Sequence, residues 1–99
     1  MANKPLRLHP EAEEEYLAAV SWYRGRSPMA ARQFQNAIRN AGVTIRQFPR
    51  RWPFLFRDFR KYTLRQFPFS VIYQEMLTEI VVFAIAHANR SPGYWKNRK

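Results

Sequence analysis

The sequence predicts an α+β fold in which a helical hairpin packs on one face of a small, mostly antiparallel sheet, in the order β-α-α-β-β-β. Between residues 10 and 48 the apolar side chains recur at helical spacing, whereas from residue 57 onward they alternate with a period of two. Two helices cannot bury their apolar faces on each other alone, so we expect both to lie on the same face of the sheet. We expect a single domain over residues 1–99.

The N-terminal half contains the signals of a short strand and two helices. Leu6 to Leu8 is a short extended segment, and a proline then suits the first position of a helix running to about Arg24. Residues 25–28 predict a tight break, in which Ser27 is expected to cap a second helix that ends soon after Gln47. Four glutamates suit the positive end of the first helix dipole, and we interpret them as helix-start residues: Glu11, Glu13, Glu14 and Glu15.

The C-terminal half contains the signals of three strands. Pro49 to Phe56 is expected to be a connector, because it is rich in proline and aromatic residues. Alternating apolar residues predict strands over about Arg57 to Leu64 and Phe67 to Tyr73, followed by a hairpin connection over Gln74 to Thr78. Glu79 to His87 is an almost unbroken apolar run, which predicts a strand buried on both faces and therefore central in the sheet.

The chain carries a strong positive charge. Seventeen Lys and Arg residues oppose seven Asp and Glu residues, which gives a formal net charge of +10. From Arg46 to Arg65 there are seven basic residues and one acid, Asp58. A charge this one-sided predicts a polyanionic partner, either a nucleic acid or an acidic protein. A basic surface that serves only solubility is the alternative.

The composition also excludes several classes of protein. Because the chain has no cysteine, it has no disulfide and no thiolate metal site, and we expect no metal or other cofactor. The longest apolar run, Ile80 to Ala86, is far too short to span a membrane. Met1 to Pro5 shows no signal peptide. We therefore expect a cytoplasmic protein without a membrane partner.

Three motifs, taken in order, resemble one known family. The first is Pro-Glu-Ala-Glu at the start of the first helix, with Trp22 and Tyr23 late in that helix. The second is Arg-Gln-Phe-Pro-Phe-Ser-Val-Ile-Tyr, which ends at Tyr73. The third lies within Ala86 to Arg98, where Ala-His and a basic loop precede Arg-Ser-Pro-Gly-Tyr-Trp. Together they resemble the RelE/ParE toxin superfamily of type II toxin–antitoxin and plasmid-stabilisation systems, over nearly the whole chain.

The resemblance implies a toxin that inhibits growth and is held inactive by a cognate antitoxin. ParE-type toxins inhibit DNA gyrase and are not known as nucleases, whereas RelE-type toxins cut mRNA on the ribosome. The long helical hairpin and the Pro-Gly-Tyr-Trp ending resemble the ParE branch, and Ala88 stands where RelE-type nucleases carry Arg. Whether the chain is an enzyme therefore stays open. A gyrase-binding toxin is the first expectation, a ribosome-dependent mRNA endonuclease the second, and a degenerate, non-toxic basic binding module the third.

Candidate catalytic residues follow from the endonuclease alternative. RNA cleavage needs a base, an acid and cations beside the phosphate. In a RelE-like enzyme these groups would come from Arg65, His87, Arg90 and Tyr94. Each also has a structural alternative. His87 and Tyr94 would then serve only in hydrogen bonding and in covering the sheet, and Arg65 would pair with a carboxylate such as Glu79 across the sheet.

Candidate contact residues follow from the charge and from the exposed aromatic side chains. We expect an acidic or amphipathic antitoxin segment to use the basic surface together with an open strand edge or a groove beside the helices. The structural alternative for Trp52 is to plug a loop over the core, and for Trp95 to fold back over the sheet. The residues expected to bind the target or the antitoxin are Arg50, Arg51, Trp52, Arg57, Arg60, Lys61, Trp95, Lys96 and Arg98.

Overall fold

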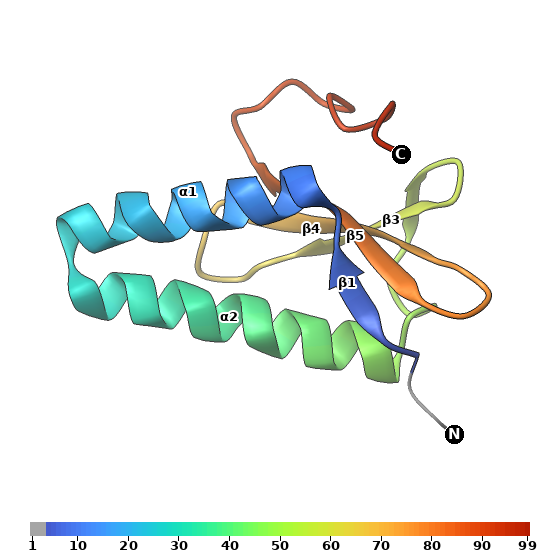
Figure 1. Cartoon of the computed structure of the whole chain (residues 1–99), viewed down its shortest axis with the longest axis horizontal. Helices are drawn as coiled ribbons and strands as arrows, with labels where there is room; N and C mark the ends of the chain where they lie inside the picture. Colours follow the sequence, from blue (N-terminus) through green and yellow to red (C-terminus); the bar gives the residue numbers. More distant parts are fainter. Residues whose placement is uncertain (1–3) are drawn as a thin grey trace.

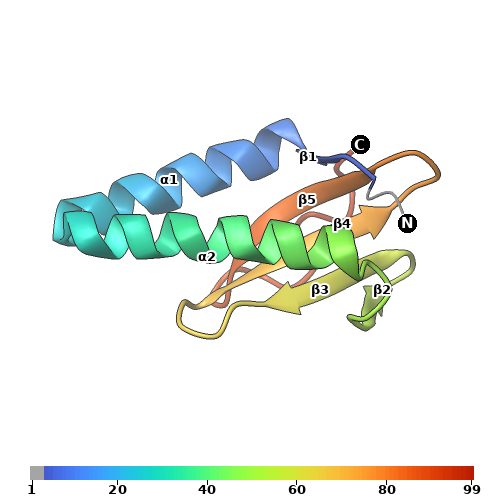
Figure 2. The same cartoon turned by 90° about the horizontal axis from the view of Figure 1, so that it is seen from below.

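Two helices lie side by side on one face of a five-stranded sheet (Figures 1 and 2), as the sequence predicts. The computed structural model describes residues 4–99, so the expectation for Met1 to Pro5 falls mostly outside it. The strand order is β1-β5-β4-β3-β2, in which β1 is parallel to β5 and the other pairs are antiparallel. The elements are β1 (Leu6–Leu8), α1 (Pro10–Arg26), α2 (Pro28–Gln47), β2 (Phe54–Phe56), β3 (Phe59–Thr63), β4 (Phe69–Glu75) and β5 (Ile80–His87).

The break predicted over residues 25–28 is confined to Ser27. Its backbone N–H donates to the carbonyl of Tyr23 at 2.8 Å, and its hydroxyl accepts from the N–H of Ala30 at 3.3 Å, so it caps both helices. The first helix extends two residues further than predicted, to Arg26. Gly25 does not end the first helix, because a glycine inside a helix costs only about 1 kcal/mol. Pro28 does end it, because a proline forces the residue before it out of the helical conformation.

Within residues 4–99, no helix has the length and apolar character needed to cross a membrane.

The segment predicted as a connector, Pro49 to Phe56, contains the short edge strand β2. The sequence prediction missed this strand because Pro53 is followed by three apolar residues without alternation. The predicted start of the next strand at Arg57 is also wrong, since β3 begins at Phe59. Arg57 has a positive φ of 49° and forms the turn between the two strands with Asp58.

The last two strands form the centre of the sheet. β4 continues to Glu75 instead of ending at Tyr73, because Glu75 stays in register with Ile80 of β5. The connection is therefore shorter than predicted and covers residues 76–79. β5 lies between β1 and β4, and residues 80–85 are all buried, which confirms the predicted central strand.

Aromatic side chains fill the space between the helices and the sheet. The ring of Phe34 on α2 is fully buried and lies 5.2 Å from the ring of Tyr23 and 5.3 Å from that of Phe67. Tyr73 of β4 is also fully buried, and its hydroxyl donates to the carbonyl of Pro49 at 2.7 Å. That bond satisfies the only polar atom of the Tyr73 side chain, so the phenol is buried without an unpaired polar group.

The C-terminal segment, residues 88–99, covers the face of the sheet opposite the helices (Figure 1). Its anchor is Trp95, whose side chain is only 3% exposed. The indole lies 4.7 Å from the ring of Phe59 and 6.4 Å from that of Phe56. This burial confirms the structural alternative for Trp95 and removes its indole from the exposed contact surface that we expected it to join.

We predict that Trp95→Ala lowers the free energy of unfolding by about 3–5 kcal/mol, because it opens a large cavity under the C-terminal segment. Urea denaturation followed by far-ultraviolet circular dichroism measures this change. The matched control is Trp22→Ala, because Trp22 is 54% exposed. The control should cost less than about 1 kcal/mol, and equal losses in the two variants would contradict the anchoring role of Trp95.

Candidate functional site

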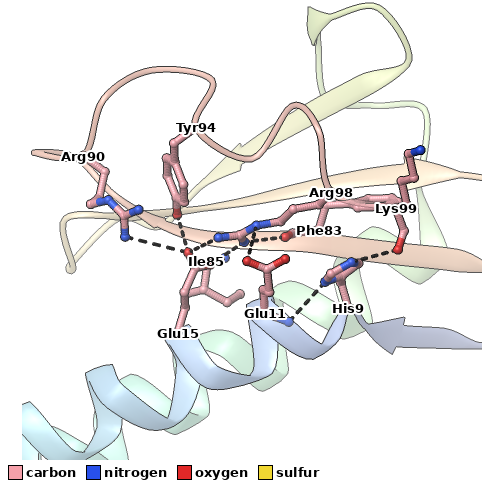
Figure 3. Close-up of polar contacts among 9 residues, drawn as sticks. All are labelled: His9, Glu11, Glu15, Phe83, Ile85, Arg90, Tyr94, Arg98 and Lys99. Carbon is pink, nitrogen blue, oxygen red and sulfur yellow. Dashed lines mark hydrogen bonds and ion pairs between the residues drawn. The ribbon is translucent and has the colours of Figure 1, made fainter.

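A carboxylate of α1, Glu15, holds the C-terminal segment against the sheet (Figure 3). Arg98 donates to both of its oxygens, from Nη1 to Oε1 at 3.1 Å and from Nη2 to Oε2 at 2.8 Å. The hydroxyl of Tyr94 donates to Oε2 at 2.7 Å, and the backbone N–H of Ile85 donates to Oε1 at 2.9 Å. Glu15 therefore accepts hydrogen bonds from two side chains and from one strand backbone.

These contacts lie at an unpaired stretch of the β5 edge. β1 pairs with β5 only as far as Val82, so the backbone beyond it has no strand partner on that side. Arg98 donates to the carbonyl of Phe83 at 2.8 Å, and Glu15 accepts from the N–H of Ile85. A buried backbone group without a partner costs about 1–3 kcal/mol, so the ion pair takes the place of an absent strand.

The N-terminus of α1 also contacts the end of the C-terminal segment (Figure 3). His9 precedes the helix, and its Nδ1 accepts from the backbone N–H of Glu11 at 3.1 Å. Its Nε2 lies 2.9 Å from the carbonyl oxygen of Lys99. The Nε of Arg98 lies 3.6 Å from the carboxylate of Glu11. The start of α1 therefore tethers the C-terminal segment at two further points.

The hydrogen bonds around Glu15 set the protonation of the whole cluster. Burial raises the pKa of Glu15, but hydrogen bonds from Arg98, Tyr94 and the N–H of Ile85 outweigh it, so the pKa lies below its usual value. Burial and the hydrogen bond to Glu15 raise the pKa of Tyr94 well above that of a free phenol. Tyr94 is therefore protonated at neutral pH and acts as a hydrogen-bond donor.

The structure brings three of the four candidate catalytic residues together. His87 accepts a hydrogen bond at Nδ1 from the backbone N–H of Asn89 at 3.0 Å. The guanidinium of Arg90 lies over the ring of Tyr94, 3.8 Å from its centroid, and 4.0 Å from the carboxylate of Glu15. His87, Arg90 and Tyr94 all line two adjacent cavities. Within the described residues, each of the three side chains thus has a structural partner.

Arg65 stands apart from this group. It is exposed in the turn between β3 and β4, and it lines neither of the two cavities. The carboxylate suggested as its partner, Glu79, instead pairs with the Nε of Arg7 at 2.9 Å. The four residues proposed for RNA cleavage therefore do not form one cluster.

The two cavities lie on either side of the C-terminal end of β5. One of about 280 Å³ opens between the C-terminal segment and the sheet, and it is lined by Lys61 and Lys96 among others. The other, of about 410 Å³, opens beside α1, where Trp22, Tyr23 and Phe69 supply an apolar lining. Within residues 4–99, no group of three or more His, Cys, Asp or Glu residues is placed to bind a metal ion.

Several of the expected contact residues have partners inside the protein. Arg50 pairs with Glu75 at 3.0 Å, and Arg60 donates to the carbonyl of Trp52 at 2.6 Å. The indole of Trp52 packs 4.8 Å from the ring of Tyr62, which agrees with the loop-plug alternative. Arg98 and Trp95 hold the C-terminal segment, as described above. The expected contact residues that are exposed and form no ion pair within the described residues are Arg51, Arg57, Lys61 and Lys96.

Glu15 is the residue that the sequence interpretation missed. We grouped it with the glutamates that begin the helix, yet its carboxylate points at the sheet and at the C-terminal segment (Figure 3). The spacing of Glu15 from the apolar residues of the helix could have identified it. Glu15 lies three residues after Ala12 and four before Ala19, which are both buried, so it shares their helix face.

We predict that Glu15→Gln lowers the free energy of unfolding at pH 7 by about 3 kcal/mol, because it removes the bidentate charge partner of Arg98 and leaves only the longer contact with Glu11, at 3.6 Å. The pKa of Glu15 in the folded protein lies below the value of 4.5 expected for the unfolded chain. Its stabilising contribution is therefore complete at neutral pH and is lost as the pH falls from about 4.5 through the folded-state pKa. Chemical denaturation between pH 3 and pH 7 should accordingly show a weaker pH dependence in the variant.

The matched control is Glu14→Gln, which removes the same charge from the next, exposed position of α1. It should change the free energy of unfolding by less than about 0.5 kcal/mol. Identical pH profiles for the wild type and the Glu15 variant would contradict this account.

Comparisons with known proteins agree with this geometry. The ParE toxin family of the type II toxin–antitoxin system parDE matches residues 6–92. A chain in the solved structure of a chromosomal ParDE TA system from P. aeruginosa has the same fold, with a TM-score of 0.76. That chain is 20% identical, and the match covers 87% of this protein and 97% of that chain. No curated protein sequence matches. Because the family match covers most of the sequence, the chain belongs to the ParE toxin family of type II toxin–antitoxin systems.

Proposed function

We propose that this ParE-family toxin stops growth in the cytoplasm by binding DNA gyrase, and that it carries out no phosphodiester chemistry. The match to the ParE family over residues 6–92 supports the gyrase target, and the hydrogen bond from Tyr94 to Glu15, at 2.7 Å, argues against phosphodiester chemistry. A toxin that cuts RNA needs groups that take and give protons near neutral pH. The raised pKa of Tyr94 makes it unsuited to that task. The remaining candidates are divided between a cavity wall and the turn that carries Arg65.

The basic surface supports a target with acidic character. Arg51, Arg57 and Lys61 are exposed on and beside the β2–β3 hairpin, and none of them has a carboxylate partner within the described residues. Arg57 lies at the tip of that hairpin with its guanidinium 5.2 Å from the ring centroid of Phe56. An exposed hairpin with cations and apolar side chains suits association with an acidic protein surface, because the charge raises the rate of encounter.

We predict that the purified toxin inhibits supercoiling by gyrase and leaves mRNA intact in a translating extract. Arg57→Glu should weaken the inhibition about tenfold, because it places a negative charge at the centre of the proposed contact. Arg32→Glu is the matched control, since Arg32 is exposed on α2 away from that hairpin. The control should keep the inhibition within about twofold of the wild type.

Three outcomes decide between the candidate functions. Supercoiling that is unaffected by excess toxin would remove the gyrase proposal. Cuts in mRNA that disappear in Arg65→Ala and Tyr94→Phe would establish the endonuclease instead. Normal growth during expression of the toxin without its antitoxin would indicate a degenerate, non-toxic member of the family.

We further propose that a cognate antitoxin inserts apolar side chains into the cavity beside α1. The cavity has a volume of about 410 Å³, and its largest exposed wall residue is Trp22, which is 54% exposed. Positive charge lies beside it. The guanidinium of Arg26 lies 4.0 Å from the ring centroid of Trp22. Arg90 lines the cavity together with Glu15, whose carboxylate is paired with Arg98. An acidic, amphipathic segment would complement both the apolar lining and this charge.

We predict that Trp22→Ala weakens binding of the co-expressed antitoxin by about tenfold or more, because it removes the aromatic wall of the cavity. Isothermal titration calorimetry measures the change. Met29→Ala is the control, because Met29 is similarly exposed on a helix but lies outside the cavity lining. Equal affinity for the wild type and Trp22→Ala would place the antitoxin elsewhere.

A further inference from the structure

The cavity between the C-terminal segment and the sheet differs in charge from the cavity beside α1. Its lining includes Lys61, Arg90 and Lys96, and it includes no aspartate or glutamate. Lys61 comes from β3, whereas Arg90 and Lys96 both come from the C-terminal segment. Its volume of about 280 Å³ is near the lower end of the range for small-molecule sites. The fold thus gathers positive charge around one small space.

Two of these cations are available to a ligand. Lys61 lies opposite Ile72 across the β3–β4 pair, on the face of the sheet that points away from the helices. The ammonium of Lys96 lies 4.3 Å from the ring centroid of Phe56. Within the described residues, neither lysine forms a hydrogen bond through its side chain or an ion pair. Arg90 is partly neutralised by Glu15, at 4.0 Å.

A glycine leaves room for the side chain of Lys96. Gly93 has a positive φ of 78°, which side chains other than that of glycine rarely adopt. A Cβ atom at this position would lie 2.3 Å from Cε of Lys96. The lysine stem therefore folds back across the loop over Gly93 itself, in space that any side chain would take. Its ammonium lies beside the cavity and over the ring of Phe56.

We propose that this cavity binds the phosphate group of a nucleotide. Two unpaired ammonium groups match the double negative charge of a phosphate monoester, whereas a peptide carboxylate supplies only one charge. The hydroxyl of Ser91 in the lining provides a neutral donor for a third phosphate oxygen. Phe56 and Ile72 form an apolar wall for the sugar or the base. Binding requires no bond to break. It does not depend on the gyrase proposal, although Lys61 also lies beside the β2–β3 hairpin.

The test measures fluorescence anisotropy of a short, labelled single-stranded oligonucleotide with a 5′-phosphate as the toxin is added. We expect Lys61→Gln and Lys96→Gln each to weaken binding about tenfold, because each removes one charge-assisted contact. Arg32→Gln removes the same charge from the exposed surface of α2 and should change the affinity less than twofold. Gly93→Ala should reproduce the loss in Lys96→Gln, because the added methyl group displaces the lysine stem.

Competition identifies the source of the phosphate. Displacement by adenosine monophosphate supports the proposal with a free nucleotide as ligand. Binding that requires the oligonucleotide, with the same losses in both lysine variants, supports it with a nucleic-acid strand as ligand. An equal loss in Arg32→Gln would show unspecific attraction to the whole basic surface and would overturn the proposal. Absence of binding, or stronger displacement by an oligoglutamate peptide than by adenosine monophosphate, would overturn it as well.

Discussion

The ion pair between Glu15 and Arg98 attaches the C-terminal segment to the first helix and to the sheet. It joins residues 83 positions apart, and it satisfies two backbone groups of β5 that no strand reaches. A buried ion pair gains little over an apolar pair of the same shape, but loss of one partner leaves the other charge uncompensated. Loss of either partner therefore weakens the attachment of the C-terminal segment, which Trp95 also holds through its contacts with Phe59 and Phe56.

This contact also engages two of the candidate catalytic residues. The hydroxyl of Tyr94 donates to Glu15 and its pKa is raised, and the guanidinium of Arg90 lies 4.0 Å from the same carboxylate. The family match ends at residue 92, before Tyr94 and Arg98, so the Glu15 cluster uses residues beyond the matched region. A surface that binds a protein target needs only fixed shape and charge, whereas a nuclease needs groups free to exchange protons. The cluster favours the former.

The sequence predicted features that are set locally and missed those set by distant contacts. Ser27 followed by proline predicts the N-cap of the second helix, and the apolar run of β5 predicts a central strand, because both depend on a few neighbouring residues. The strand β2 was missed because only pairing with β3 gives it structure. Trp95 and Arg98 were assigned to a binding surface because a basic, aromatic segment has that composition. In the structure Trp95 is buried and Arg98 contacts Glu15, which is far away in sequence.

The basic residues of the chain have two different roles. Five of the seventeen basic residues are committed to ion pairs with carboxylates within the described residues. The others produce a field that attracts any polyanion, and such a field alone selects no partner. Selection must therefore come from short-range features that differ between surfaces. The hairpin around Arg57 exposes its tip, whereas Lys61 and Lys96 line a small cavity with an apolar wall. The same net charge can thus guide a protein to the first surface and a phosphate to the second.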